Sequence, residues 1–236
     1  MQKNPDYIEG IFNYCDRWCE RCVFTARCLN YAFGEEMERQ DKACDEETKR
    51  FWAEIDRSCA DMVEKTESLD ASYNPAPTGF GDELEYRMEK EAAKSHPCAL
   101  RAYAYIDKVD AWFKAAGLAA GHEQVPASSL DDSLQVVRWY QRFIYVKLMR
   151  ALHGFQRDPE QLSDAQSSPN GSIKIALIAI DRSIGAWGIL LRLVPDVKGA
   201  TNEIIVYCSG LRRLVEETFP AARAFVRPGF DAGETI

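Results

Sequence analysis

Four of the eight cysteines of this chain lie within one stretch of fourteen residues. They are Cys15, Cys19, Cys22 and Cys28, and they form the pattern C-x3-C-x2-C-x5-C. Thiolate sulfurs are soft, anionic ligands that suit zinc, copper(I) and iron–sulfur clusters. The two-residue spacing between Cys19 and Cys22 lets one tight turn direct two sulfurs at the same ion. The sequence therefore predicts a metal site formed by these four cysteines.

The backbone must bend for all four cysteines to reach one metal. Cys15 precedes Cys19 by about one helical turn, so a continuous helix would place Cys15, Cys19 and Cys22 on one face. Cys28 would then point away from that face. We therefore expect the chain to turn between Cys22 and Cys28 if all four residues are ligands.

The compact spacing favours a [4Fe-4S] cluster, because ferredoxin-type sites also use closely spaced cysteines followed by a further one. Structural zinc sites more often combine two C-x2-C pairs across a long spacer, and only one such pair is present here. Zinc in a non-enzymatic interaction protein is therefore the alternative. The third possibility is that the cysteines bind no metal and are buried, as cysteines often are. That explanation suits the scattered cysteines better, although a role of Cys44, Cys59 or a histidine at the metal site stays open.

The first three cysteines also match the C-x3-C-x2-C motif of radical-SAM enzymes. This resemblance covers eight residues and implies that three thiolates hold a [4Fe-4S] cluster. The chain departs from the family pattern at Arg21, where those enzymes usually carry an aromatic residue. It also lacks the strand-rich repeat that an α/β barrel needs. Fold context must confirm such a short motif.

Composition places the chain among globular proteins of a reducing compartment. Of its 236 residues, 46% are hydrophobic and 28% are charged, and the net charge is −8. This acidic balance argues against general nucleic-acid binding, which needs a basic surface. The N-terminus has no apolar signal core, and no apolar run reaches the length of a membrane span. We therefore expect a cytoplasmic protein with reduced thiols, and a redox partner protein if the cluster is present.

Hydrophobic periodicity predicts an all-α protein, a bundle of about six main helices with the cysteine-rich segment at its N-terminus. A loop at residues 71–81, rich in Pro, Asn and Gly, divides a segment at 1–70 from a bundle at 82–236, although one continuous domain stays possible. Gly34 is expected to end the first element. The predicted helical regions are 5–33, 47–68, 82–117 with a break before Pro97, 129–152, 173–194 and 201–219.

The region at 173–194 is apolar but contains Lys174, Asp181 and Arg182, and buried charges must be paired. Cations on the neighbouring region at 129–152 are candidate partners of Asp181. Structural ion pairs are one interpretation. The other is a helical enzyme or sensor with an anion pocket between the helices, because arginine binds carboxylates and phosphates with a planar fork. The residues of that predicted pocket are Arg138, Arg142, Arg150 and Asp181.

Histidines offer little evidence of catalysis. The chain has three, and none belongs to an H-E-x-x-H or Glu-x-x-His motif. His96 lies at the break before Pro97, where we expect Ser95 to cap the next helix. No nucleophile elbow of the form G-x-S-x-G is present. The sequence therefore leaves open whether the protein is an enzyme.

Overall fold

A computed structural model describes residues 6–42, 91–117 and 129–231, together with Arg50, Ala53, Glu54 and Arg57. The predicted stripe at 47–68, the loop at 71–81, Cys44 and Cys59 lie largely or wholly outside these residues. The chain divides into two compact units. One contains residues 1–12 and 18–84, and the other contains 13–17 and 85–236.

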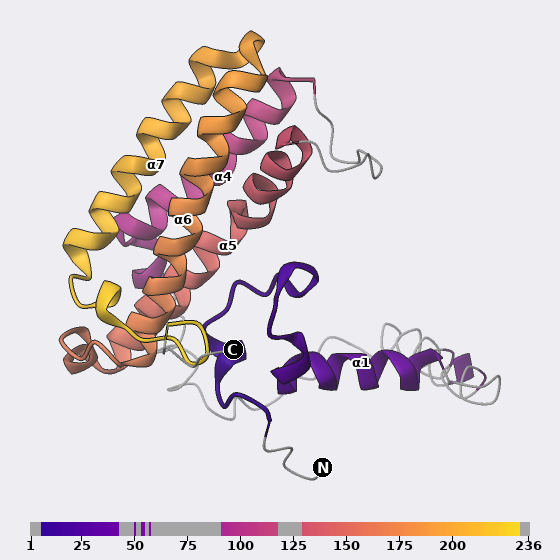
Figure 1. Ribbon diagram of the computed structural model, residues 1–236. Coiled ribbons are helices and arrows are strands. Elements are labelled where there is room, and N and C mark those ends of the chain that lie inside the picture. The colour runs from indigo at the N-terminus through magenta and orange to yellow at the C-terminus, as the bar shows by residue number, and fades with distance from the viewer. Residues whose placement is uncertain are drawn as a thin grey trace, which may run out of the picture. The chain divides into compact units, whose positions relative to one another are not determined.

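The second unit is built on four long helices: α4 (Pro97–Ala115), α5 (Ser129–Arg157), α6 (Ser168–Leu193) and α7 (Lys198–Thr218). Helix α6 packs against α5 and α7, and α4 also packs against both of them, so the four helices form a closed bundle (Figure 1). Short 3-10 helices connect or follow them: η4 (Pro159–Leu162), η5 (Pro195–Val197) and η6 (Ala222–Ala224). The predicted all-α bundle is confirmed.

Aromatic side chains link the bundle helices in the core. The rings of Trp112 and Trp187 meet edge to face at 4.9 Å, and both side chains are almost completely buried. Each indole N–H has a partner, since Trp112 donates to Thr201 Oγ1 at 2.8 Å and Trp187 donates to Tyr105 Oη at 3.0 Å. These bonds satisfy the polar ends of large buried rings, which would otherwise carry a desolvation cost. They also connect α4 to α6 and α7.

The helix starts differ from the predicted ones because other residues cap them. His96, not Ser95, is the N-cap of α4, and its Nδ1 accepts the backbone N–H of Cys98 at 3.2 Å. Helix α6 begins five residues before the predicted start at 173, because Ser167 caps it and Pro169 occupies its first turn. Proline fits there because the first helical N–H groups have no intrahelical partner.

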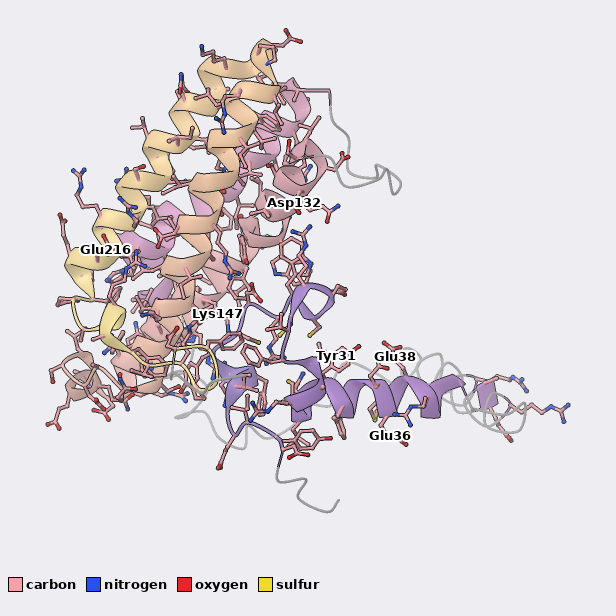
Figure 2. The ribbon with its side chains drawn as sticks, in the orientation of Figure 1. Tyr31, Glu36, Glu38, Asp132, Lys147 and Glu216 are labelled. Atoms are coloured by element: carbon pink, nitrogen blue, oxygen red, sulfur yellow. The ribbon has the colours of Figure 1, made fainter. Side chains whose placement is uncertain are left out.

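The cysteine-rich segment is not one long helix. Three 3-10 helices, η1 (Ile11–Asn13), η2 (Cys19–Arg21) and η3 (Thr25–Arg27), precede α1 (Leu29–Lys42). The expected end at Gly34 is wrong, because α1 continues through it. Exposed apolar side chains on α1 include Phe33 and Met37, and Glu36 and Glu38 project from different sides of it (Figure 2).

Hydrogen bonds to backbone carbonyls join the start of the first unit to the turn at η3. The N–H of Ile8 donates to the carbonyl of Arg27 at 3.0 Å, and Arg27 Nε donates to the carbonyl of Asp6 at 3.1 Å. The segment that precedes the cysteines therefore returns to the turn at η3. No helix within the described ranges is long and apolar enough to cross a membrane.

Candidate functional site

Cys19 and Cys22 stand at the two ends of one tight turn. Cys19 begins η2, and the N–H of Cys22 donates back to the carbonyl of Cys19 at 3.1 Å. The N–H of Phe24 then donates to Cys22 Sγ at 3.4 Å. Metal-bound cysteine sulfurs commonly accept such backbone hydrogen bonds. This turn supplies the local geometry that the two-residue spacing predicts.

The backbone also turns between Cys22 and Cys28. Both residues have extended backbone conformations, and η3 lies between them. The N–H of Cys28 closes that turn on the carbonyl of Thr25 at 3.2 Å. The bend that sequence reasoning required for Cys28 to be a ligand is therefore present, while the continuous helix is not.

Cys15 belongs to the second unit, with residues 13–17, whereas Cys19, Cys22 and Cys28 belong to the first. Burial raises the pKa of the Cys15 thiol, and the backbone N–H of Arg17 partly opposes that rise. Arg17 has a φ of 61°, a left-handed conformation that is uncommon outside glycine. The strained residue thus lies between Cys15 and Cys19 in the chain.

The four cysteines of the motif are partly exposed thiols that are not joined in disulfides, whereas the thiols of Cys98 and Cys208 are buried. Among the residues that the structure describes, no three His, Cys, Asp or Glu side chains are arranged as a group that could hold a metal ion. The sulfur donors of the motif suit a thiolate-bound metal in chemical type, and metal binding commonly completes the folding of its own site.

Lys147 is a buried cation on α5, and Figure 2 labels it. Burial, assisted by the nearby charge of Arg150, lowers its pKa to about 8. Its Nζ lies 5.2 Å from the ring centroid of Phe143. Cys15 opposes the lowering electrostatically, so the amine and this thiol are neighbours in the second unit.

The residues of the predicted anion pocket lie in different surroundings. Arg138 donates to Asp110 at 2.9 Å and its guanidinium lies 3.5 Å from the ring centroid of Phe113. Asp181 pairs with Arg223 at 2.8 Å and with Arg212 at 3.5 Å. Arg142 and Arg150 have exposed side chains on α5. Asp181 thus pairs with cations from α7 and from the segment after it.

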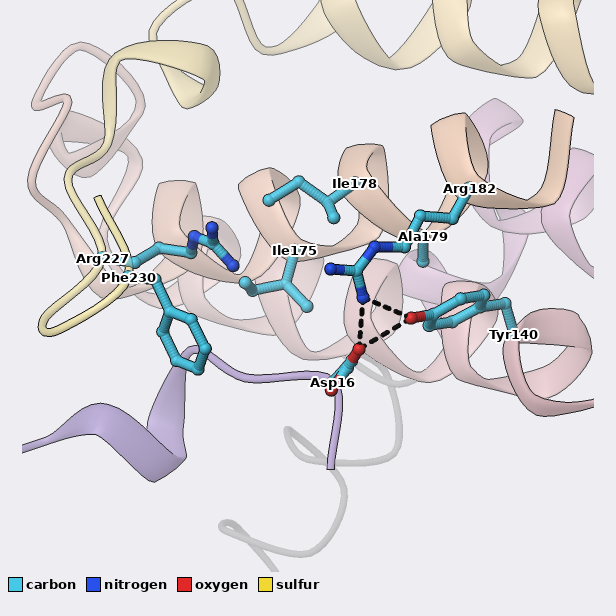
Figure 3. A pocket seen from close by; sticks show the side chains of 8 residues that line it. All are labelled: Asp16, Tyr140, Ile175, Ile178, Ala179, Arg182, Arg227 and Phe230. Carbon is cyan, nitrogen blue, oxygen red and sulfur yellow. Dashed lines mark hydrogen bonds and ion pairs between the residues drawn. The ribbon is translucent and has the colours of Figure 1, made fainter. Parts of the chain in front are cut away.

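A different polar cluster forms around Asp16, which sequence reasoning did not select as a site residue. Arg182 Nη1 donates to Asp16 Oδ2 at 2.5 Å and to Tyr140 Oη at 2.6 Å, and Tyr140 Oη donates to Asp16 Oδ2 at 2.7 Å (Figure 3). Trp139 Nε1 also donates to the carbonyl of Asp16 at 2.9 Å. The sequence signal for this cluster was the charge of Arg182 within an apolar helix, because such a charge requires a partner.

This cluster forms one end of a pocket that lies within the second unit. The pocket contains about 270 Å³ of empty space, part of it open to solvent. Its apolar lining comes mainly from α6 and from the C-terminal segment, and Arg227 lies at the end opposite Arg182 (Figure 3). The lining residues are Asp16, Tyr140, Ile175, Ile178, Ala179, Arg182, Arg227 and Phe230.

The C-terminal segment is anchored beside this pocket by aromatic packing. Phe225 is buried, and its ring centroid lies 4.5 Å from that of Tyr14. Both rings press on Gly171, where an added Cβ would lie 2.4 Å from Tyr14 and 2.7 Å from Phe225. Only glycine permits this close approach, so a residue of α6 fixes both chain segments that line the pocket.

Comparison with protein-family models, curated proteins and solved structures found no match for this chain.

Proposed function

We propose that the chain binds a metal through Cys15, Cys19, Cys22 and Cys28, as a [4Fe-4S] protein with an electron-transfer or sensing role. The observation that carries the proposal is the turn at Cys19 and Cys22, with the Phe24 N–H donating to Cys22 Sγ. Hydrogen bonds to ligating sulfurs stabilise their negative charge and help to set the potential of a cluster. Cys15 is included because it belongs to the same C-x3-C-x2-C-x5-C pattern in the sequence.

The exposure of the cysteines supports the same function. Apolar cysteines that serve only packing are usually buried, as Cys98 and Cys208 are. The four cysteines of the motif instead remain partly exposed and are not paired in disulfides. Arg17, Arg21 and Arg27 lie between them in the sequence and can offset the charge of several thiolates. A bound [4Fe-4S] cluster would supply a one-electron couple, and a redox partner protein would exchange that electron.

Metal analysis with a visible spectrum of anaerobically purified full-length protein tests this proposal. We expect iron and sulfide in near-stoichiometric amounts and a brown absorption band that reductant bleaches. One zinc per chain without colour would replace the cluster with the alternative, a structural zinc site of four cysteines. Protein without metal would overturn both assignments.

Variants then locate the ligands. We expect the Cys19→Ala/Cys22→Ala double variant to lose the metal, because it removes both sulfurs of the turn. Cys98→Ala and Cys208→Ala are the matched controls, because each removes one buried thiol outside the motif, and they should retain it. Retention of the metal by the double variant would rule out this site.

A further inference from the structure

The pocket bounded by Arg182 and Arg227 has features that the metal proposal does not use. It combines two guanidinium groups with an apolar lining from Ile175, Ile178 and Phe230. Natural ligand pockets have this character, a mainly apolar wall with a few polar groups that fix orientation. The pocket is small and partly open to solvent, so its size suits a molecule no larger than an amino acid.

Both arginines keep donors available within the described part of the chain. Arg227 donates through Nε and Nη2 to the carboxylate of Asp231, at 3.0 and 2.8 Å, which leaves its Nη1. Arg182 makes its hydrogen bonds through Nη1, which leaves Nε and Nη2. The two guanidinium groups flank Ile175 in Figure 3. An oxyanion between them would meet donors from both ends and an apolar surface below.

The charged side chains around the pocket indicate how much negative charge a ligand should carry. Asp16 balances Arg182, and Asp231 balances Arg227. Lys174 adds a third cation close to Asp231, whose pKa is lowered first by its hydrogen bond with Arg227 and to a smaller extent by Lys174. Lys174 Nζ donates to the carbonyl of Arg223 at 2.6 Å, a neutral partner. The cluster therefore carries one net positive charge, which matches a monoanion better than a phosphate dianion.

From these observations we propose that the pocket binds a small monocarboxylate with an apolar or aromatic substituent. The carboxylate lies between Arg182 and Arg227, and the substituent packs on Ile175, Ile178 and Phe230. Carboxylates suit this position because a guanidinium presents parallel N–H groups in their geometry. The site differs from the sequence-predicted pocket at Arg138, Arg142 and Arg150, and none of its anion-binding groups is a proposed metal ligand.

Titration calorimetry on the full-length chain tests the site with phenylacetate and hexanoate as probes. We expect both to bind at least about tenfold more tightly than acetate, because burial of the substituent adds to the ionic contact. Inorganic phosphate should bind more weakly than either probe. Equal binding of acetate and phenylacetate would overturn the apolar half of the proposal, and tighter binding of phosphate would overturn the carboxylate assignment. No binding of either probe would overturn the site.

Three variants locate the ligand. Arg227→Gln should weaken phenylacetate binding by about tenfold, the loss of one charge-assisted hydrogen bond. Ile178→Trp, at a partly exposed position, should abolish binding by filling the pocket without altering its charge. Arg192→Gln is the matched control, because Arg192 is exposed in the last turn of the same helix. Unchanged binding in the first two variants, with unfolding midpoints like that of the wild type, would show that the ligand binds elsewhere.

Discussion

Cysteines occur in two contrasting environments in this molecule. Cys98 and Cys208 lie on long helices of the bundle with 0% and 1% of their surface exposed. The four cysteines near the N-terminus lie in or beside short 3-10 turns and stay partly exposed. Helical packing explains the first group without any ligand. The second group has no comparable packing role, so the place of a cysteine in the fold distinguishes candidate ligands from core residues better than cysteine content does.

The largest expected effect is a difference in thiol reactivity. In metal-free, reduced protein, we expect iodoacetamide to modify Cys19, Cys22 and Cys28 at least about a thousandfold faster than Cys208, because a buried thiol reacts only after the bundle opens. Burial also raises the pKa of Cys208 to about 12, which removes the reactive thiolate at neutral pH. Mass spectrometry of timed digests measures each site. Equal labelling rates would show that the N-terminal cysteines are no more accessible than the buried thiol of Cys208.

A smaller effect is expected when the core beside Cys208 is weakened. Trp187→Ala removes a fully buried ring and its hydrogen bond to Tyr105, and should lower the free energy of unfolding by about 3–5 kcal/mol. Cys208 labelling should accelerate strongly, while Cys22 labelling should stay the same. Urea denaturation followed by circular dichroism measures the stability. Faster labelling of Cys22 in this variant would mean that the two groups are not independent.

Cys15 provides an intermediate test, because its segment packs with the bundle. Asp16→Ala removes the acceptor of Tyr140 and Arg182 and should cost about 1 kcal/mol, since Arg182 is half-exposed and regains water. We expect Cys15 labelling to accelerate severalfold, with Cys22 unchanged. Glu203→Ala, at an exposed acid on α7, is the control for the loss of a negative charge. Unchanged Cys15 reactivity would show that Asp16 does not anchor this segment.

The smallest effect concerns pH at the start of α4. Burial lowers the pKa of His96 from 6.5, so the neutral form is favoured in the folded state. The neutral imidazole of His96 therefore contributes stability that is present above pH 6.5 and is lost as the pH falls through the pKa of the folded state. Protonation also removes the Nδ1 acceptor for the Cys98 N–H, a cap that contributes about 1 kcal/mol.

His96→Asn, a cap that does not titrate, should flatten this pH dependence. Urea denaturation at pH 7.5 and 5.5 compares the wild type with the variant. The Cys98 thiol should become more reactive relative to Cys208 at the lower pH in the wild type alone, with a pyridyl disulfide as the reagent. A variant that keeps the wild-type pH dependence would exclude His96 as its source.

The all-α class and the positions of most bundle helices could be predicted from the sequence. Apolar residues at helical spacing specify which face of a segment must be buried, and this information is local. The turn chemistry around Cys19 and Cys22 is local for the same reason, because a two-residue spacing constrains few backbone angles. The expected end at Gly34 was wrong, since a single glycine in a helix costs only about 1 kcal/mol and is tolerated.

The partners of the charged residues, in contrast, depend on how the helices pack. The composition of α6 required a partner for Arg182, yet that partner is Asp16, which is 166 positions away in the sequence. Asp181 likewise pairs with Arg212 and Arg223, whereas a cation from the preceding helix was expected. Many acids and bases satisfy the same demand for pairing, and only the packing of the helices brings one combination within hydrogen-bonding distance. The pocket at Arg182 and Arg227 depends on that packing, because chain segments distant in sequence form its walls.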